Sequence, residues 1–350
     1  MPRVVSFFIV LTIFSVWVYA AGSKQGKKDP PVWVTDAPNV YPEERYLTAL
    51  GTGQSRKEAE VGALEALAAI FDRKISIETQ AELNYTSSVT DGQSEKVNKT
   101  KNVGQNVSIS TNVDDLIGVE IKERWLSPDG THYALAVLDK SKTASAYMEK
   151  INANERTIAE LTQIPDTDKN TIREFIRYRS AYLVAAENAI YRARLSVIKP
   201  SAHALAKEKG MTAQSLKLKC MDVAKNIHIV ISVDGDNHGK IKSAFAKVLS
   251  AEGFNTSTNE NPNYTLVAKL SLADGEVQAN NKILVRYSLD AEFTETGSST
   301  VLVPYSVSGR EILLAKSSAD NKIFTGLEKK IQNDFGKSFN EYLSGLKSDK

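Results

Sequence analysis

The segment from Tyr46 to Phe71 places the strongest constraint on how the first half of this chain folds. Residues 46–50 form a short apolar run typical of a buried strand. Ser55 stands where a helix N-cap is expected, and Glu58 completes a capping box three residues later. Small and apolar residues then recur at helical spacing, namely Ala59, Ala63, Leu67, Ile70 and Phe71. The segment predicts a strand followed by a helix that can lie close to a sheet.

Gly51 and Gly53 stand between the predicted strand and the predicted helix. Glycine reaches backbone angles closed to other residues, so the pair predicts a turn. A Gly-x-Gly in this place is also how a dinucleotide-binding loop begins. Arg56 stands where the third glycine of that loop would be, and no parallel βαβ pattern follows. The pair therefore indicates a turn before a helix cap, and no cofactor is predicted.

The following residues alternate between apolar and polar side chains, which predicts strands over 75–86, 103–113 and 117–125. Ser127-Pro-Asp-Gly130 predicts a hairpin turn that leads into a returning strand at 133–137. Before this sheet, Pro30 and Pro31 predict an extended segment, which Trp33 would pin onto the domain. Residues 36–44 read as a loop. Residues 31–140 are thus predicted to form a sheet covered on one face by a helix over 55–71.

Helical periodicity replaces strand alternation in the middle of the chain. Helices are predicted over 144–161 and 171–197, followed by two short ones over 201–209 and 213–225. Residues 141–225 would form an antiparallel helical hairpin with a linker. Four side chains of the second long helix suggest a polar and aromatic flank for binding a partner: Tyr178, Arg179, Tyr182 and Tyr191.

A second mixed domain is predicted over residues 226–350. It would contain a strand at 227–233, a helix at 240–251, three strands within 264–306 and a long final helix from residue 324. Gly336 predicts a bend in that helix. The predicted fold class is α+β, with two sheet-plus-helix domains joined by the antiparallel helical hairpin.

The N-terminus indicates export. Residues 1–20 read as a signal peptide, because Arg3 precedes an uncharged run from Val4 to Gly22, and Val18-Tyr-Ala20 before Ala21 resembles a signal-peptidase site. The alternative is an uncleaved anchor, through which the chain would associate with a membrane. Both interpretations predict a place in the periplasm or at the outer membrane. Cys220 is the only cysteine, so neither an intramolecular disulfide nor a lipid anchor on an N-terminal cysteine is predicted.

Candidate chemistry is sparse in this sequence. A net charge of +2 does not favour nucleic acid as a partner. The four histidines fall in different predicted elements, and no metal site is predicted. Asp234-Gly-Asp236-Asn resembles the start of a calcium loop, but its twelfth position is Phe245, so Asp236 or Asn237 is expected to cap a helix. No catalytic residue and no cofactor is predicted, and the protein is expected not to be an enzyme.

Trp33-Val followed by Tyr46-Leu-Thr-Ala-Leu-Gly-Thr-Gly53 resembles the Lpp-twenty lipoprotein domain of bacterial envelope proteins. The resemblance covers about residues 31–140 and implies a sheet-plus-helix module in the periplasm or on the outer membrane, without catalysis. A similar domain begins the flagellar assembly protein T, where a domain resembling the N-terminal domain of TolB follows. Residues 225–350 are similar to that second domain in outline.

Together these features predict a non-catalytic scaffold or binding factor of the cell envelope, with an envelope protein or peptidoglycan as its partner. Exposed sheet edges would supply a surface for such binding. Three alternatives stay open: a flagellar-assembly protein, a peptidoglycan-binding module, and an enzyme whose site forms at the domain junction around His228 and His238.

Overall fold

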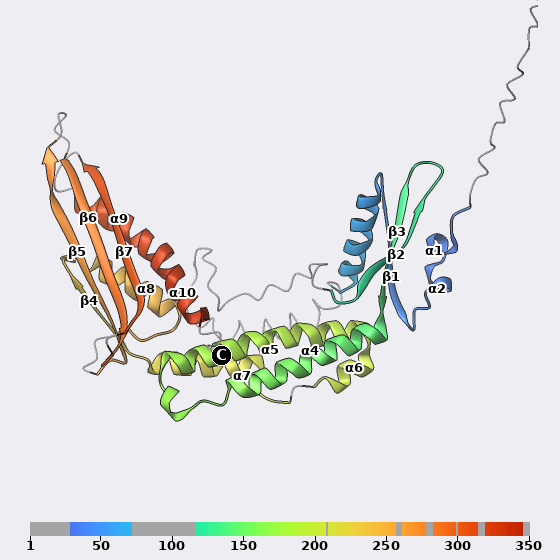
Figure 1. Ribbon diagram of the computed structural model, residues 1–350, viewed down its shortest axis with the longest axis horizontal. Helices are drawn as coiled ribbons and strands as arrows, with labels where there is room; N and C mark the ends of the chain where they lie inside the picture. The colour runs from blue at the N-terminus through green and yellow to red at the C-terminus, as the bar shows by residue number, and fades with distance from the viewer. Residues whose placement is uncertain are drawn as a thin grey trace, which may run out of the picture.

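The computed structural model describes residues 29–71, 116–207, 209–256, 261–277, 283–298, 300–313 and 319–345. Two sheet modules stand at opposite ends of a helical platform and rise from the same side of it (Figure 1). The α+β fold class with two sheets is confirmed. The predicted strands over 75–86 and 103–113 and the predicted signal peptide lie outside the described residues. Among the described helices, none is both long and apolar enough to cross a membrane.

The N-terminal module is an antiparallel sheet with the order β1-β3-β2. Its strands are β1 (Tyr46–Gly53), β2 (Val119–Leu126) and β3 (His132–Asp139). The predicted hairpin turn joins β2 to β3, and Gly130 adopts the positive φ of 86° that this turn needs. A helix over residues 56–71 covers one face of the sheet with buried alanines and leucine.

Two short helices lie on the other face of this sheet, α1 (Val32–Thr35) and α2 (Ala37–Val40). The predictions of an extended segment after Pro31 and of a loop over 36–44 are therefore wrong in part. A proline restricts the residue before it, and it is well tolerated at the start of a helix. Pro31 precedes α1 directly, so its neighbours on the C-terminal side are free to turn.

The platform contains α4 (Lys140–Leu161), α5 (Ile172–Ile198), α6 (Pro200–Leu205) and α7 (Ala213–Asn226). A 3-10 turn at Asp166–Asp168 lies between α4 and α5, which pack as the predicted antiparallel hairpin, and α7 packs along α5. The first helix begins four residues earlier than predicted, because the side chain of Asp139 accepts hydrogen bonds from the amides of Ser141 and Lys142 at 3.0 Å.

The C-terminal module is a sheet with the order β4-β5-β6-β7, in which β4 runs parallel to β5 and the other pairs are antiparallel. Its strands are β4 (Ile229–Asp234), β5 (Tyr264–Val277), β6 (Ile283–Glu295) and β7 (Val301–Leu313). Three helices lie on one face of the sheet (Figure 1): α8 (Lys240–Ala251), α9 (Ala319–Lys330) and α10 (Gly336–Gly345).

The predicted final helix is interrupted by a π-helical turn at Ile331–Phe335, directly before Gly336. The wider turn keeps both Ile331 and Phe335 fully buried in the core. Gly336 itself has ordinary helical angles, φ −56° and ψ −40°. We therefore attribute the π-helical turn to the packing of Ile331 and Phe335 and not to Gly336.

The helix α5 belongs to both hydrophobic cores. Near its start, Ile172, Phe175 and Ile176 are buried in the core of the C-terminal module. Near its end, Leu195 and Ile198 are buried with the alanines of the helix over 56–71. The proposed boundaries of 31–140, 141–225 and 226–350 stay a prediction, since one 27-residue helix is part of the core at each end.

A buried hydrogen bond ties the start of α5 to the C-terminal sheet. The amide of Ile172, in the first turn of the helix, donates to the hydroxyl of Tyr264 at 3.0 Å in a buried setting. We expect Tyr264→Phe to destabilise the protein by about 1–3 kcal/mol, because it leaves a buried amide without an acceptor. Urea unfolding followed by circular dichroism measures this loss. A stability equal to that of the parent would contradict the role given to this bond.

Candidate functional site

Gly51 and Gly53 lie within β1 at the contact with the helix over 56–71. Neither has a positive φ, so the prediction that they form a turn is wrong. A Cβ on Gly51 would lie 2.1 Å from the backbone nitrogen of Ala63, and one on Gly53 would lie 2.5 Å from the Cβ of Glu58. These glycines are needed because the helix backbone touches the strand, which leaves no room for a methyl group.

The predicted capping box forms at the start of this helix, with one change of partner. The amide of Glu58 donates to Ser55 Oγ at 3.3 Å. The carboxylate of Glu58 accepts from the amide of Gln54 at 2.9 Å, one residue before the N-cap. Glu60, on the next turn, forms ion pairs with Arg124 of β2 at 2.6 Å and with Arg56 at 2.7 Å. The start of this helix is thus held by hydrogen bonds within its first turn and by an ion pair to the sheet.

Trp33 is buried on the sheet face opposite that helix, against Leu135 and Val137 of β3. Four further aromatic side chains, Tyr41, Tyr46, Trp125 and Tyr133, surround it and are partly exposed. Trp33 thus lies on the first module, as expected for a residue that anchors the segment before β1. The aromatic cluster around it was missed by the sequence analysis, although Trp125 and Tyr133 flank the hairpin turn at positions that pair across the strands.

The predicted interaction flank on α5 does not exist as one surface. Arg179 is buried, with 7% of its area exposed. Tyr182 packs in the middle of the platform beside Leu216. Tyr178 contributes to that cluster and to the C-terminal core, and Tyr191 packs against the ring of Tyr147 at 5.4 Å near the N-terminal module. Tyr178, Arg179 and Tyr182 also point in other directions around the helix than Tyr191. The four residues therefore form no continuous flank, and a role for them in binding stays a prediction.

Arg179 instead forms a polar junction between the platform and the C-terminal module. Its Nη2 lies 3.9 Å from the carboxylate of Glu252, at the end of α8, and donates to Asn340 Oδ1 of α10 at 3.4 Å. Its Nη1 is buried and has no hydrogen-bond partner within the described residues. Cys220 lies close by, and burial raises the pKa of its thiol to about 12, which disfavours the thiolate form.

Glu252 gives this junction a pH dependence. Burial raises the pKa of its carboxyl group above the ordinary value, and the Arg179 charge lowers it only partly. The folded state therefore holds the proton of the Glu252 carboxyl group more tightly than the unfolded state does. The stability that this proton contributes is present below the unfolded-state pKa of Glu252 and is lost as the pH rises through its folded-state pKa. We expect the difference in unfolding free energy between Glu252→Gln and the parent to shift in favour of the variant as the pH rises above the ordinary pKa of a glutamate carboxyl group. Urea titrations at a series of pH values check this; a constant difference would contradict it.

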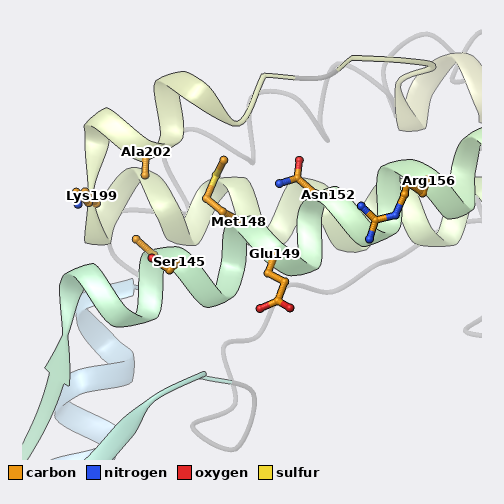
Figure 2. A pocket seen from close by; sticks show the side chains of 8 residues that line it. Ser145, Met148, Glu149, Asn152, Arg156, Lys199 and Ala202 are labelled. Atoms are coloured by element: carbon orange, nitrogen blue, oxygen red, sulfur yellow. The ribbon is translucent and has the colours of Figure 1, made fainter.

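A shallow pocket of about 470 Å³ lies between α4 and the start of α6 (Figure 2). Met148 and Asn152 extend from α4 toward one side, and Glu149 extends toward the other (Figure 2). Lys199 and Arg156 lie at opposite ends of the pocket (Figure 2). These side chains offer a mixed polar and apolar surface.

The two histidines of the enzyme hypothesis lie at opposite ends of β4. The amide of His228 donates to Asn263 Oδ1 at 2.8 Å before the strand, while the ring of His238 contacts Phe324 at 5.9 Å after it. Asp236 accepts from the amides of Lys240 and Lys242 at 3.0 and 2.8 Å, so it caps α8 as expected. Within the described ranges, no three His, Cys, Asp or Glu side chains are grouped to hold a metal ion.

Comparison with known proteins identifies the class of the N-terminal module. Residues 31–139 match the LPP20 lipoprotein family. Residues 31–139 are therefore an LPP20 lipoprotein domain, and this match supports an exported, envelope-associated protein. No curated protein matches the chain.

Solved structures resemble the chain in part. The secreted protein HP1454 from Helicobacter pylori is 17% identical, with a TM-score of 0.42, over 83% of this chain and 100% of that one. A minor lipoprotein from Acinetobacter baumannii is 12% identical, with a TM-score of 0.24, over 34% of this chain and 90% of that one.

Proposed function

We propose that this protein is a non-catalytic scaffold of the bacterial envelope that holds two sheet modules at a fixed separation. The observation that carries the proposal is the helix α5, which is buried in a different core at each end. A helix of its 27 residues extends for about 40 Å. Because the two cores share this helix, neither module can rotate without breaking apolar contacts. Such a fixed spacing is useful for binding two envelope components together and serves no evident purpose in catalysis.

The middle of the platform supports the same proposal. Ile158 of α4, Ala181 and Ala185 of α5 and Leu216 of α7 form a buried cluster between the two modules. Arg177 of α5 donates to the backbone carbonyls of Glu160, Leu161 and Gln163 at 2.8–3.2 Å. These donations bind the last turn of α4 and the residue after its C-cap to α5. The hairpin is therefore fixed along its length and not only at its ends.

Distance measurements between spin labels test the proposal. With Cys220 replaced by alanine, labels are placed at the exposed positions Lys57 and Ser308, one in each module. We expect one narrow distance distribution, because the shared helix fixes the spacing. Leu195→Ala should broaden it by opening a cavity where α5 enters the N-terminal core, whereas Leu183→Ala, at a position 43% exposed on the same helix, should not. A broad distribution in the parent would overturn the proposal.

A further inference from the structure

Positive charge is concentrated in the part of the platform that contains α6 and α7. Residues 199–226 include six lysines and two acidic residues, Glu208 and Asp222, so the net charge of this segment is +4, while that of the whole chain is +2. The lysines are Lys199, Lys207, Lys209, Lys217, Lys219 and Lys225. The rest of the chain is therefore slightly acidic, and this segment stands out from it as basic.

The charge of these lysines is accessible. Five of them are exposed, and Lys217 is half-buried. Within the described residues, none of the six takes part in an ion pair. On the neighbouring helix α4, Glu155 is paired with Arg192, and Glu149 extends to the side away from α6 (Figure 2). The acidic groups nearby therefore neutralise little of the positive charge.

Large apolar side chains are exposed among the lysines. Leu205, at the end of α6, is 74% exposed, and Leu218 and Met221 of α7 are 50% and 37% exposed. The helix α6 lies on the side of α4 away from the N-terminal module (Figures 1 and 2). A single exposed leucine is common on a protein surface. Exposed leucine and methionine beside a group of lysines are typical of a surface that contacts lipid.

The spacing along α7 separates a buried face from an exposed one. Leu216 packs in the middle of the platform, and Val223 packs in the core of the C-terminal module. Leu218, Met221 and Lys225 follow one another at steps of three and four, so they share the face that points away from these cores. The exposed face of α7 therefore presents apolar side chains and an ammonium group together.

We propose that the α6–α7 surface, defined as the six lysines with Leu205, Leu218 and Met221, rests on a membrane that contains anionic phospholipids. Clusters of about four to eight basic residues are attracted to such membranes through the headgroup phosphates. Exposed apolar side chains between them enter the boundary between headgroups and acyl chains. A nucleic acid or another acidic polymer would pair with the lysines but would gain nothing from Leu218. The inference rests on the envelope location in the proposed function, and it does not depend on the fixed spacing of the modules.

Sedimentation of the full chain with lipid vesicles tests the charge part of this proposal. The vesicles contain phosphatidylcholine with or without phosphatidylglycerol. We expect the parent to prefer the anionic vesicles and to lose this preference as salt is added. Binding should weaken by about tenfold or more when three exposed lysines of the surface are neutralised, in Lys207→Gln with Lys219→Gln and Lys225→Gln. The matched control changes the same charge on exposed lysines of the C-terminal module, Lys242→Gln with Lys329→Gln and Lys337→Gln.

A pair of leucine variants tests the apolar part. Leu218→Ser should weaken binding to the anionic vesicles by about threefold or more, because the leucine side chain no longer leaves water. Leu126→Ser is the control, since Leu126 is 56% exposed and lies on the N-terminal module. The basic N-terminal residues are the same in every variant, so differences between variants report on the surface alone. Thermal unfolding of each variant confirms that it remains folded.

Three results would overturn the proposal. The first is equal binding of the parent to neutral and anionic vesicles, and the second is equal binding by the two triple-lysine variants. The third is a loss of binding in the lysine variant with no loss in Leu218→Ser, which would make the segment a site for acidic polymers in general. The label distances between the two modules should be the same in all these variants and the parent. Failure of the membrane proposal is therefore distinguishable from failure of the scaffold proposal.

Discussion

Replacing Gly51 by alanine is expected to unfold the N-terminal module while the C-terminal module stays folded. The added methyl group would lie 2.1 Å from the nitrogen of Ala63 and 2.2 Å from the carbonyl oxygen of Ala59. Both are backbone atoms of a helix, so neither can move aside as a flexible side chain could. We expect a loss of more than about 4 kcal/mol, which belongs to the largest effects of single substitutions.

The matched control for Gly51→Ala is Gly62→Ala, on the helix side of the same contact. A Cβ on Gly62 would have Gly51 Cα as its nearest neighbour at 3.8 Å, an ordinary contact distance. Because alanine is also the better helix former, this variant should gain about 0.5–1 kcal/mol. Urea unfolding followed by circular dichroism and by tryptophan fluorescence, with Trp17 replaced by phenylalanine, compares the two. Fluorescence then reports on Trp33 and Trp125, both in the N-terminal module. Equal stabilities would show that the helix can move away from β1.

Local signals in the sequence were sufficient for much of the fold. Residues 240–251 were predicted as a helix and form α8 over the same range, because the amphipathic pattern ends at a glycine. The hairpin turn at 127–130 and the capping role of Ser55 were likewise carried by short-range chemistry. In each case the residues that determine the conformation lie within a few positions of it.

The contacts that fix the candidate surfaces depend on residues far apart in the sequence. Position 51 requires glycine because the backbone of Ala63 lies against it where the strand meets the helix. From the sequence alone, a glycine required by such a contact looks the same as a glycine required by a turn. The sequence predicts an exposed Arg179, because its partners Glu252 and Asn340 are far from it in the chain and meet it only in the folded structure. The aromatic cluster around Trp33 forms because Tyr46 and Trp125 lie on outer strands of one sheet with β3 between them. These juxtapositions follow from tertiary structure, which periodicity does not encode.

Arg179→Ala is expected to be the most damaging substitution at the junction between the platform and the C-terminal module. It leaves the carboxylate of Glu252, whose side chain is 12% exposed, without its cation, and it removes the donor to Asn340. Removing one partner of a buried ion pair costs about 3–5 kcal/mol, because the remaining charge keeps its desolvation penalty.

The double variant Arg179→Met with Glu252→Leu should recover much of that loss, since it removes both charges and retains the volume. Arg173→Ala is the control on the same helix: Arg173 is 48% exposed and pairs with Asp168 at 3.2 Å and Glu295 at 3.8 Å. An exposed pair of this kind contributes less than about 1 kcal/mol. Urea unfolding of the four proteins at neutral pH measures these differences. If Arg179→Ala lost no more stability than Arg173→Ala, water would have to reach Glu252 in the folded protein, and the junction would be an open contact that allows the modules to move.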